Sequence, residues 1–132
     1  AMEQKELIAY WMKSSDRDFE TMQHLFEKKD YHWALFLGHL VLEKLLKAYY
    51  VKQIDTNPPL IHNLLRLAEK SGLTVCEEQE DVLDTISTFN IRARYDDYKS
   101  EFYQLCTQEF TMQWITHIKE LRTWIKHELS KS

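Results

Sequence analysis

The sequence has only two glycines and two prolines in 132 residues, so it offers few places where the chain can turn sharply. Its two cysteines, Cys76 and Cys106, lie far apart and form no Cys-x-x-Cys pair. No apolar run approaches the roughly 20 residues that are needed to span a bilayer. We therefore predict long helices with few connections, two free thiols, and a soluble protein of the reducing cytoplasm.

Several classes of functional site lack the residues that they require. No Gly-rich phosphate loop can be built, because Gly38 and Gly72 are the only glycines. No Glu-x-x-His pair of the di-iron type occurs, and the reversed pairs at 24–27 and 117–120 are typical of solvated helix faces. A net charge of −4 argues against a protein that coats nucleic acid, although a local basic patch remains compatible with it. We predict no metal, no cofactor and no catalytic residue.

The hydrophobic pattern that is present predicts an all-α protein. Apolar residues recur at steps of three and four over residues 4–28, and residues 31–54 are apolar over most of their circumference, which is typical of a central helix. Residues 82–93 and the segment after Thr107 carry further apolar stripes. We expect one domain over residues 2–130, built as an antiparallel up-and-down bundle of four long helices and one short helix.

Local signals predict where these helices begin and end. Asp30 is a candidate N-cap, Pro58 and Pro59 suit the first turn of the short helix, and Thr74 with Glu77 matches a capping box. Residues 92–106 lack a regular apolar pattern and are expected to be irregular.

Two features of the apolar residues concern close packing. Gly38 lies inside the predicted second helix, where we expect another backbone or a bulky ring to approach closely. The four tryptophans exceed what one small core hides, so we predict a homodimer that buries part of them, namely Trp11, Trp33, Trp114 and Trp124.

A polar line crosses the predicted second helix. His39, Glu43 and Lys47 recur every four residues and share one face, with Lys44 beside them. The favoured interpretation is a solvent-facing stripe with a Glu43–Lys47 pair. The alternative interpretation is a groove lined for anionic ligands.

The densest mixture of cations and aromatic rings lies at residues 89–99. Arg92 and Arg94 suit phosphate contact, and Tyr95 and Tyr98 suit stacking on a base, so this segment is a candidate for nucleotide or RNA binding. An alternative is equally physical: Arg94 pairs with the carboxylate of Asp96, Asp97 or Glu43, and the tyrosine rings cap the core.

Three segments together resemble the HEPN family of prokaryotic helical domains, in order and in spacing. They are HLVLEKLLKA at 39–48, IHNL at 61–64 and RARY at 92–95. The resemblance implies a bundle of four or five helices, usually dimeric and often encoded beside a minimal nucleotidyltransferase. It also implies that some relatives are metal-independent ribonucleases, in which an Arg is followed four to six residues later by a His.

The sequence departs from that nuclease motif. No His follows Arg92 or Arg94 within reach, so the catalytic imidazole of the motif is absent. The resemblance therefore implies a non-catalytic subunit that binds nucleotide or RNA as a homodimer beside a minimal nucleotidyltransferase. The predicted cleft contains Lys44, Lys47, Arg92, Arg94 and Tyr95, supported by His39, Glu43, His62 and Tyr98.

Two other functions stay open. In the first, the chain is a metal-independent ribonuclease in which His39 or His62 replaces the missing imidazole. In the second, it is a purely structural interaction module, whose exposed Trp and Tyr side chains bind a partner helix.

Overall fold

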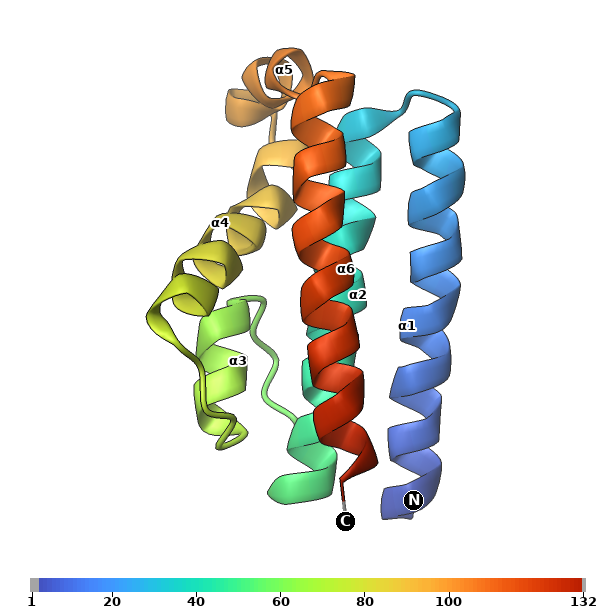
Figure 1. The fold of residues 1–132 in the computed structure, drawn as a ribbon, viewed down its shortest axis with the longest axis vertical. Coiled ribbons are helices and arrows are strands. Elements are labelled where there is room, and N and C mark those ends of the chain that lie inside the picture. Colours follow the sequence, from blue (N-terminus) through green and yellow to red (C-terminus); the bar gives the residue numbers. More distant parts are fainter. Residues whose placement is uncertain (1–2, 132) are drawn as a thin grey trace.

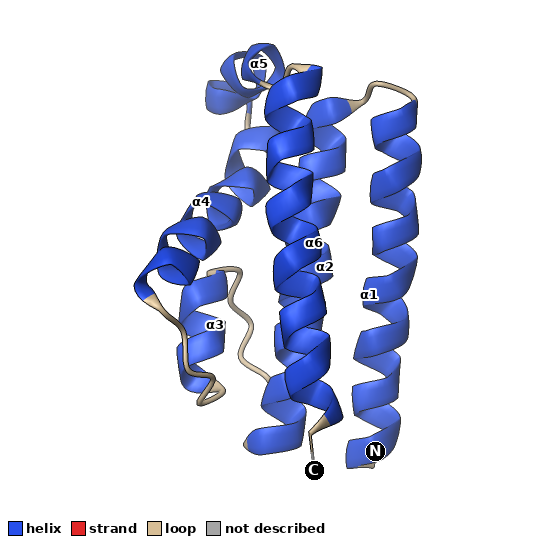
Figure 2. Cartoon of the chain, viewed as in Figure 1, coloured by secondary structure: helices blue, strands red, loops and turns tan. Residues whose placement is uncertain are grey.

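The computed structural model describes residues 3–131, which form six helices and no strand (Figure 2). None of these helices is both long and apolar enough to cross a membrane. The predicted all-α class is confirmed, and Met2, the predicted first residue of the domain, lies outside the described residues. The helices are α1 (Gln4–Glu27), α2 (Tyr31–Gln53), α3 (Leu64–Lys70), α4 (Glu77–Arg94), α5 (Asp96–Leu105) and α6 (Gln108–Ser130).

Helix α2 is the centre of the fold. It contacts α1, α3, α4, α5 and α6. The four long helices α1, α2, α4 and α6 alternate in direction along the chain, so that α6 packs beside α2 with the same direction (Figure 1). Helix α4 is tilted away from the other three, and the short α3 and α5 lie near its two ends. The prediction of a central second helix is confirmed.

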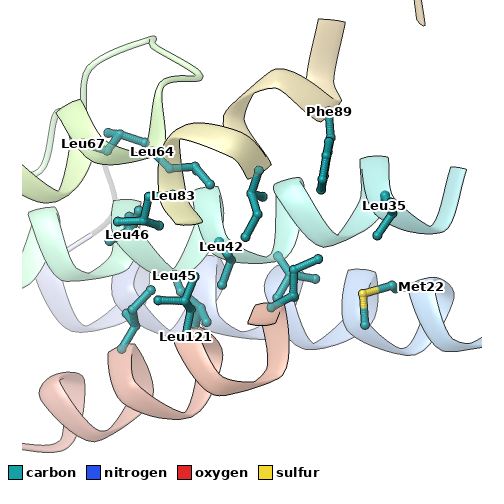
Figure 3. Packing of buried hydrophobic residues seen from close by; sticks show 14 of the residues in the cluster. Met22, Leu35, Leu42, Leu45, Leu46, Leu64, Leu67, Leu83, Phe89 and Leu121 are labelled. Carbon is teal, nitrogen blue, oxygen red and sulfur yellow. The ribbon is translucent and has the colours of Figure 1, made fainter. Parts of the chain in front are cut away.

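The core consists of apolar side chains that all six helices direct at one another. Figure 3 shows leucines of α2 surrounded by residues of α1, α3, α4 and α6. Burial of each such side chain contributes about 1.5–3 kcal/mol, which makes this cluster the main stabilising element. The predicted stripes of the later helices are confirmed, because Ile86, Phe89, Ala93, Ile118, Leu121 and Ile125 are all buried.

The prediction that residues 92–106 are irregular is wrong, because this segment contains the end of α4 and the whole of α5. Only Phe102 of α5 is buried, so this helix has no apolar stripe that a sequence pattern can reveal. Its first turn carries Asp96 and Asp97, whose negative charges stabilise the helix by interacting with the positive, N-terminal end of its dipole.

The predicted helix starts need three corrections. Pro58 and Pro59 lie in the loop of residues 54–63, and α3 begins only after Asn63, whose Oδ1 accepts a hydrogen bond from the Arg66 amide at 3.0 Å. The capping box of α4 is formed by Cys76 and Gln79, two residues later than predicted. Asp30 occupies the N-cap position of α2, but its side chain accepts no capping hydrogen bond. In contrast, Thr107 caps α6 as its position suggested, accepting from the Phe110 amide at 3.1 Å.

The four tryptophans do not form an unpartnered surface. Trp11, Trp33, Trp114 and Trp124 are all partly buried and pack against the core of their own chain. Each of the four indoles keeps an exposed part in the single chain, so the homodimer that would cover it stays a prediction. Other large apolar side chains are the exposed ones, and they include Ile91, Tyr95, Tyr98 and Tyr103 on α4 and α5 and at their junction.

Gly38 lies where α6 packs closely against α2. A Cβ atom at this position would overlap with the Cδ1 atom of Ile118 and would lie 3.3 Å from the sulfur of Met22. The close neighbour is thus an aliphatic side chain. The prediction that another backbone or a bulky ring approaches Gly38 is wrong.

This geometry predicts that Gly38→Ala and Ile118→Val are coupled. Ile118→Val alone costs about 0.5–1.5 kcal/mol through the lost methyl group, but it removes the atom with which a Cβ at position 38 collides. We expect the double variant to be more stable than the sum of the single changes by roughly 1 kcal/mol or more. Urea unfolding of the four proteins measures this, and additive free energies of unfolding would contradict it.

Candidate functional site

The polar line of α2 is buried and does not face solvent. The exposed fractions of His39, Glu43 and Lys47 are 0%, 4% and 7%. The favoured interpretation as a solvent-facing stripe is therefore wrong. Because other helices and the loop at 54–63 cover α2, these side chains must satisfy one another, since a buried polar group without a partner is costly.

His39 joins α2 to the loop and to α4. Its Nε2 lies 2.8 Å from the carbonyl oxygen of His62, so Nε2 carries the proton and donates it. Its Nδ1 is then an acceptor, and the side-chain amide of Asn90 lies 3.5 Å away. Burial lowers the pKa of His39, which favours this neutral imidazole.

Glu43 holds the ring of His62 in place. One carboxylate oxygen lies 2.8 Å from His62 Nδ1, and the other accepts from Lys47 Nζ at 3.1 Å. Burial by itself raises the pKa of Glu43, but the hydrogen bond from His62 and the charge of Lys47 outweigh it, so the net pKa is lowered. Glu43 is therefore a buried, ionised carboxylate between two donors.

The His62 side chain is 62% exposed, although its Nδ1 is bound to buried Glu43. It borders a pocket of about 450 Å³ between α4 and the residues just before α3. We call this the His62–Arg94 pocket; its lining is His62, Asn63, Asp84, Ser87, Thr88, Asn90, Ile91, Arg94 and Tyr95.

Arg94 supplies the cation of this pocket. Its Nε donates to the Asn90 carbonyl at 3.0 Å, and a terminal nitrogen donates to the Asn90 side-chain oxygen. The guanidinium also lies over the rings of Phe36 and Tyr95, at 5.4 and 5.5 Å from their centroids. Within residues 3–131 it pairs with no carboxylate, so the expected alternative of an Arg94 ion pair with Asp96, Asp97 or Glu43 is not found.

Three of the predicted cleft residues lie elsewhere. Lys44 pairs with Asp18 of α1 at 2.6 Å, Lys47 is held by Glu43, and Arg92 lies over the ring of Phe102 at 4.9 Å. The structure brings together only Arg94 and Tyr95 of the five, and it adds His62 from the supporting set. Tyr98 is exposed on α5 and does not line the pocket.

Asn90 is the residue that sequence reasoning missed. It is 3% exposed and connects His39 to Arg94. A signal was present, since Asn90 is a polar residue beside the apolar stripe of α4 and precedes Arg94 by one helical turn.

Neither cysteine belongs to this pocket. Burial raises the pKa of the Cys106 thiol to about 12, which keeps it protonated and unreactive. Cys76 is exposed at the start of α4 and lines a different hollow, together with Val82 and Trp124.

The family model described as HEPN domain matches residues 8–128. The chain belongs to the HEPN family. The match includes every residue of the His62–Arg94 pocket, and the family suggests a function related to nucleotides or RNA. No curated protein and no solved structure matches this HEPN domain.

The burial of His39 predicts a pH-dependent stability. Because its pKa is lowered on folding from the ordinary value of 6.5, the unfolded chain binds more protons as the pH falls below that value. His39 thus contributes stability that is fully present above pH 6.5 and is lost as the pH falls toward its folded pKa.

We expect His39→Gln to show a shallower loss of unfolding free energy than the unchanged protein between about pH 6.5 and pH 5. Urea unfolding at a series of pH values measures the slope. His24→Gln, at an exposed site on α1, is the matched control and should keep the original slope. Equal slopes in all three proteins would show that His39 is not the responsible group.

Proposed function

We propose that this HEPN domain binds a phosphate-bearing nucleotide or RNA in the His62–Arg94 pocket. The observation that carries the proposal is Arg94, a cation without a carboxylate partner among the described residues, held at a pocket beside an exposed aromatic ring. Such a cation attracts phosphate oxygens, and the ring of Tyr95 offers a face to a base.

The bracing by Asn90 prepares Arg94 for this task. A guanidinium has five N–H donors, and Asn90 engages two of them, so three remain for a ligand. Because the side chain is already held in place, less conformational entropy is lost when a phosphate binds. Tyr95 is 55% exposed at the same pocket.

Other groups of the pocket suit the rest of a nucleotide. The exposed His62 ring offers its Nε2, since Nδ1 is engaged by Glu43. Asp84 lines the same pocket and repels phosphate, so we place the phosphate at the Arg94 side and a ribose hydroxyl or a base amino group near Asp84.

We further propose that the domain acts as a non-catalytic homodimeric subunit with a separately encoded minimal nucleotidyltransferase. The resemblance noted in the sequence supports this arrangement. The exposed ring of Tyr98 on α5, which lies outside the pocket, supports it as well, because a second protein surface can cover it.

Arg94→Ala should weaken the binding of AMP, ATP and a short oligoribonucleotide by roughly 10- to 100-fold, the loss expected when a charge-assisted hydrogen bond is removed. Arg92→Ala is the matched control, because Arg92 lies two residues away on α4 but lies over Phe102 outside the pocket. Titration with fluorescently labelled ligands measures the affinities, and light scattering on the same samples reports the oligomeric state.

Equal weakening by Arg92→Ala would locate the ligand elsewhere. Absence of any affinity in the unchanged protein would contradict the proposal and favour the structural interaction module.

A second candidate function, a metal-independent ribonuclease, is favoured by the orientation of His62. His39 is fully buried with both ring nitrogens engaged, so it cannot reach a substrate. His62 instead presents an exposed imidazole whose other nitrogen is held by a carboxylate, the arrangement that orients a general base.

The two functions predict different results when purified protein is incubated with an oligoribonucleotide and EDTA. The non-catalytic proposal expects the RNA to stay intact. The second candidate expects cleavage that His62→Gln reduces by at least about 100-fold, the usual contribution of general base catalysis. Gel analysis of labelled RNA distinguishes them, with His127→Gln on α6 as a control for contaminating or nonspecific activity.

A further inference from the structure

His32, in the first turn of α2, is a buried polar side chain without a complete set of partners. It is 7% exposed, and its Nδ1 has no hydrogen-bond partner among the described residues. Native proteins leave few buried polar atoms unpaired, so such an atom calls for an explanation. The network around His39 and Glu43 does not include it.

Two hollows meet at this histidine. One holds about 360 Å³ and is lined by His32, Asp96, Lys99, Ser100 and Tyr103. The other holds about 270 Å³ and shares His32 and Tyr103 with the first. His32 and Tyr103 therefore lie between two spaces, at the place where α5 covers the start of α2.

The ring of Tyr103, which lies beside His32, has a face available for stacking with a ligand. The rings of His32 and Tyr103 are 5.1 Å apart at an angle of 76°, so neither lies flat on the other. Tyr103 is 64% exposed. The ring centroids of Trp33 and His32 are 5.0 Å apart, and Lys99 Nζ lies 5.5 Å from the Trp33 ring centroid.

The chemistry of His32 is that of a neutral imidazole. Burial lowers its pKa, the charge of Lys99 lowers it further, and Asp30 acts weakly in the opposite direction. A neutral imidazole has one donor and one acceptor nitrogen. It can therefore pair with the polar edge of a planar heterocycle.

This aromatic hollow lies along the same side of α2 as the His62–Arg94 pocket. His32 and His39 are seven residues apart, which places them on one helix face and separates them by roughly 10 Å. Helix α5, which carries Lys99 and Tyr103, begins directly after Arg94 and Tyr95. One extended ligand can thus contact both places.

We propose that His32, Lys99 and Tyr103 form a base-binding subsite for single-stranded RNA held by the His62–Arg94 pocket. Tyr103 stacks on a base, the free nitrogen of His32 hydrogen-bonds to the edge of that base, and Lys99 contacts the adjoining phosphate. Because Tyr103 is mostly exposed, rotation of its side chain makes room beside His32. This inference rests on the proposed function, since the same RNA occupies both places.

The test compares a six-nucleotide oligoribonucleotide with an abasic oligomer of equal length, which keeps the phosphates and lacks the bases. The unchanged protein should bind the first more tightly by roughly 100-fold, the order expected when one base stacks on Tyr103 and another on Tyr95. Tyr103→Ala should reduce that preference by roughly tenfold and His32→Phe by about threefold or more through the loss of one hydrogen bond, and both should leave the affinity for the abasic oligomer unchanged. His32→Phe retains an aromatic ring at the buried position and so guards against misfolding.

Two further variants separate the possible failures. Arg94→Ala should weaken the binding of both oligomers, and Tyr10→Ala, at an exposed tyrosine on α1, should change neither. If neither Tyr103→Ala nor His32→Phe reduces the preference for bases, the subsite is overturned while the proposed function stands. If neither oligomer binds the unchanged protein, the proposed function and the subsite are both overturned.

Discussion

The Glu43 carboxylate lies buried at the middle of α2, and the loop that precedes α3 depends on it for its position. Its two oxygens are divided between Lys47 on the same helix and His62 in the loop. Removing one partner of a buried ion pair costs several kcal/mol, because the remaining charge has no water to solvate it. The pairing therefore constrains both the helix that carries Glu43 and the loop residue that completes it.

The other features of the site follow from this constraint. With the His62 ring held by Glu43, the His62 carbonyl accepts from His39, and the next residue, Asn63, caps the N-terminus of α3. The Leu64 amide then donates to Ser87 of α4 at 2.9 Å, which joins the loop to the opposite wall of the pocket. The pocket is thus a consequence of how α2 satisfies its buried polar groups.

The sequence predicts the long helices well, since each is marked by apolar residues at helical spacing, and α4 and α6 each bury a clear stripe. It does not predict α5, in which Phe102 alone is buried and the helix carries no apolar stripe. For the site, spacing shows that His39, Glu43 and Lys47 share a face, but it cannot show whether that face meets water or another segment. Their burial depends on contacts with His62 and Asn90, which are distant in sequence.

The separation of Arg92 from Arg94 was, by contrast, already implied by helix geometry. Two steps along a helix turn a side chain by roughly 200°, so these guanidinium groups point to opposite sides. The same geometry limits what an absent motif means. No histidine follows the arginines at helical spacing, yet the fold places His62, more than 30 residues earlier, beside Arg94 in the same pocket. An imidazole can therefore be missing from a local pattern and still belong to the site, and whether it acts as a ligand contact or as a proton acceptor depends on what its free nitrogen meets.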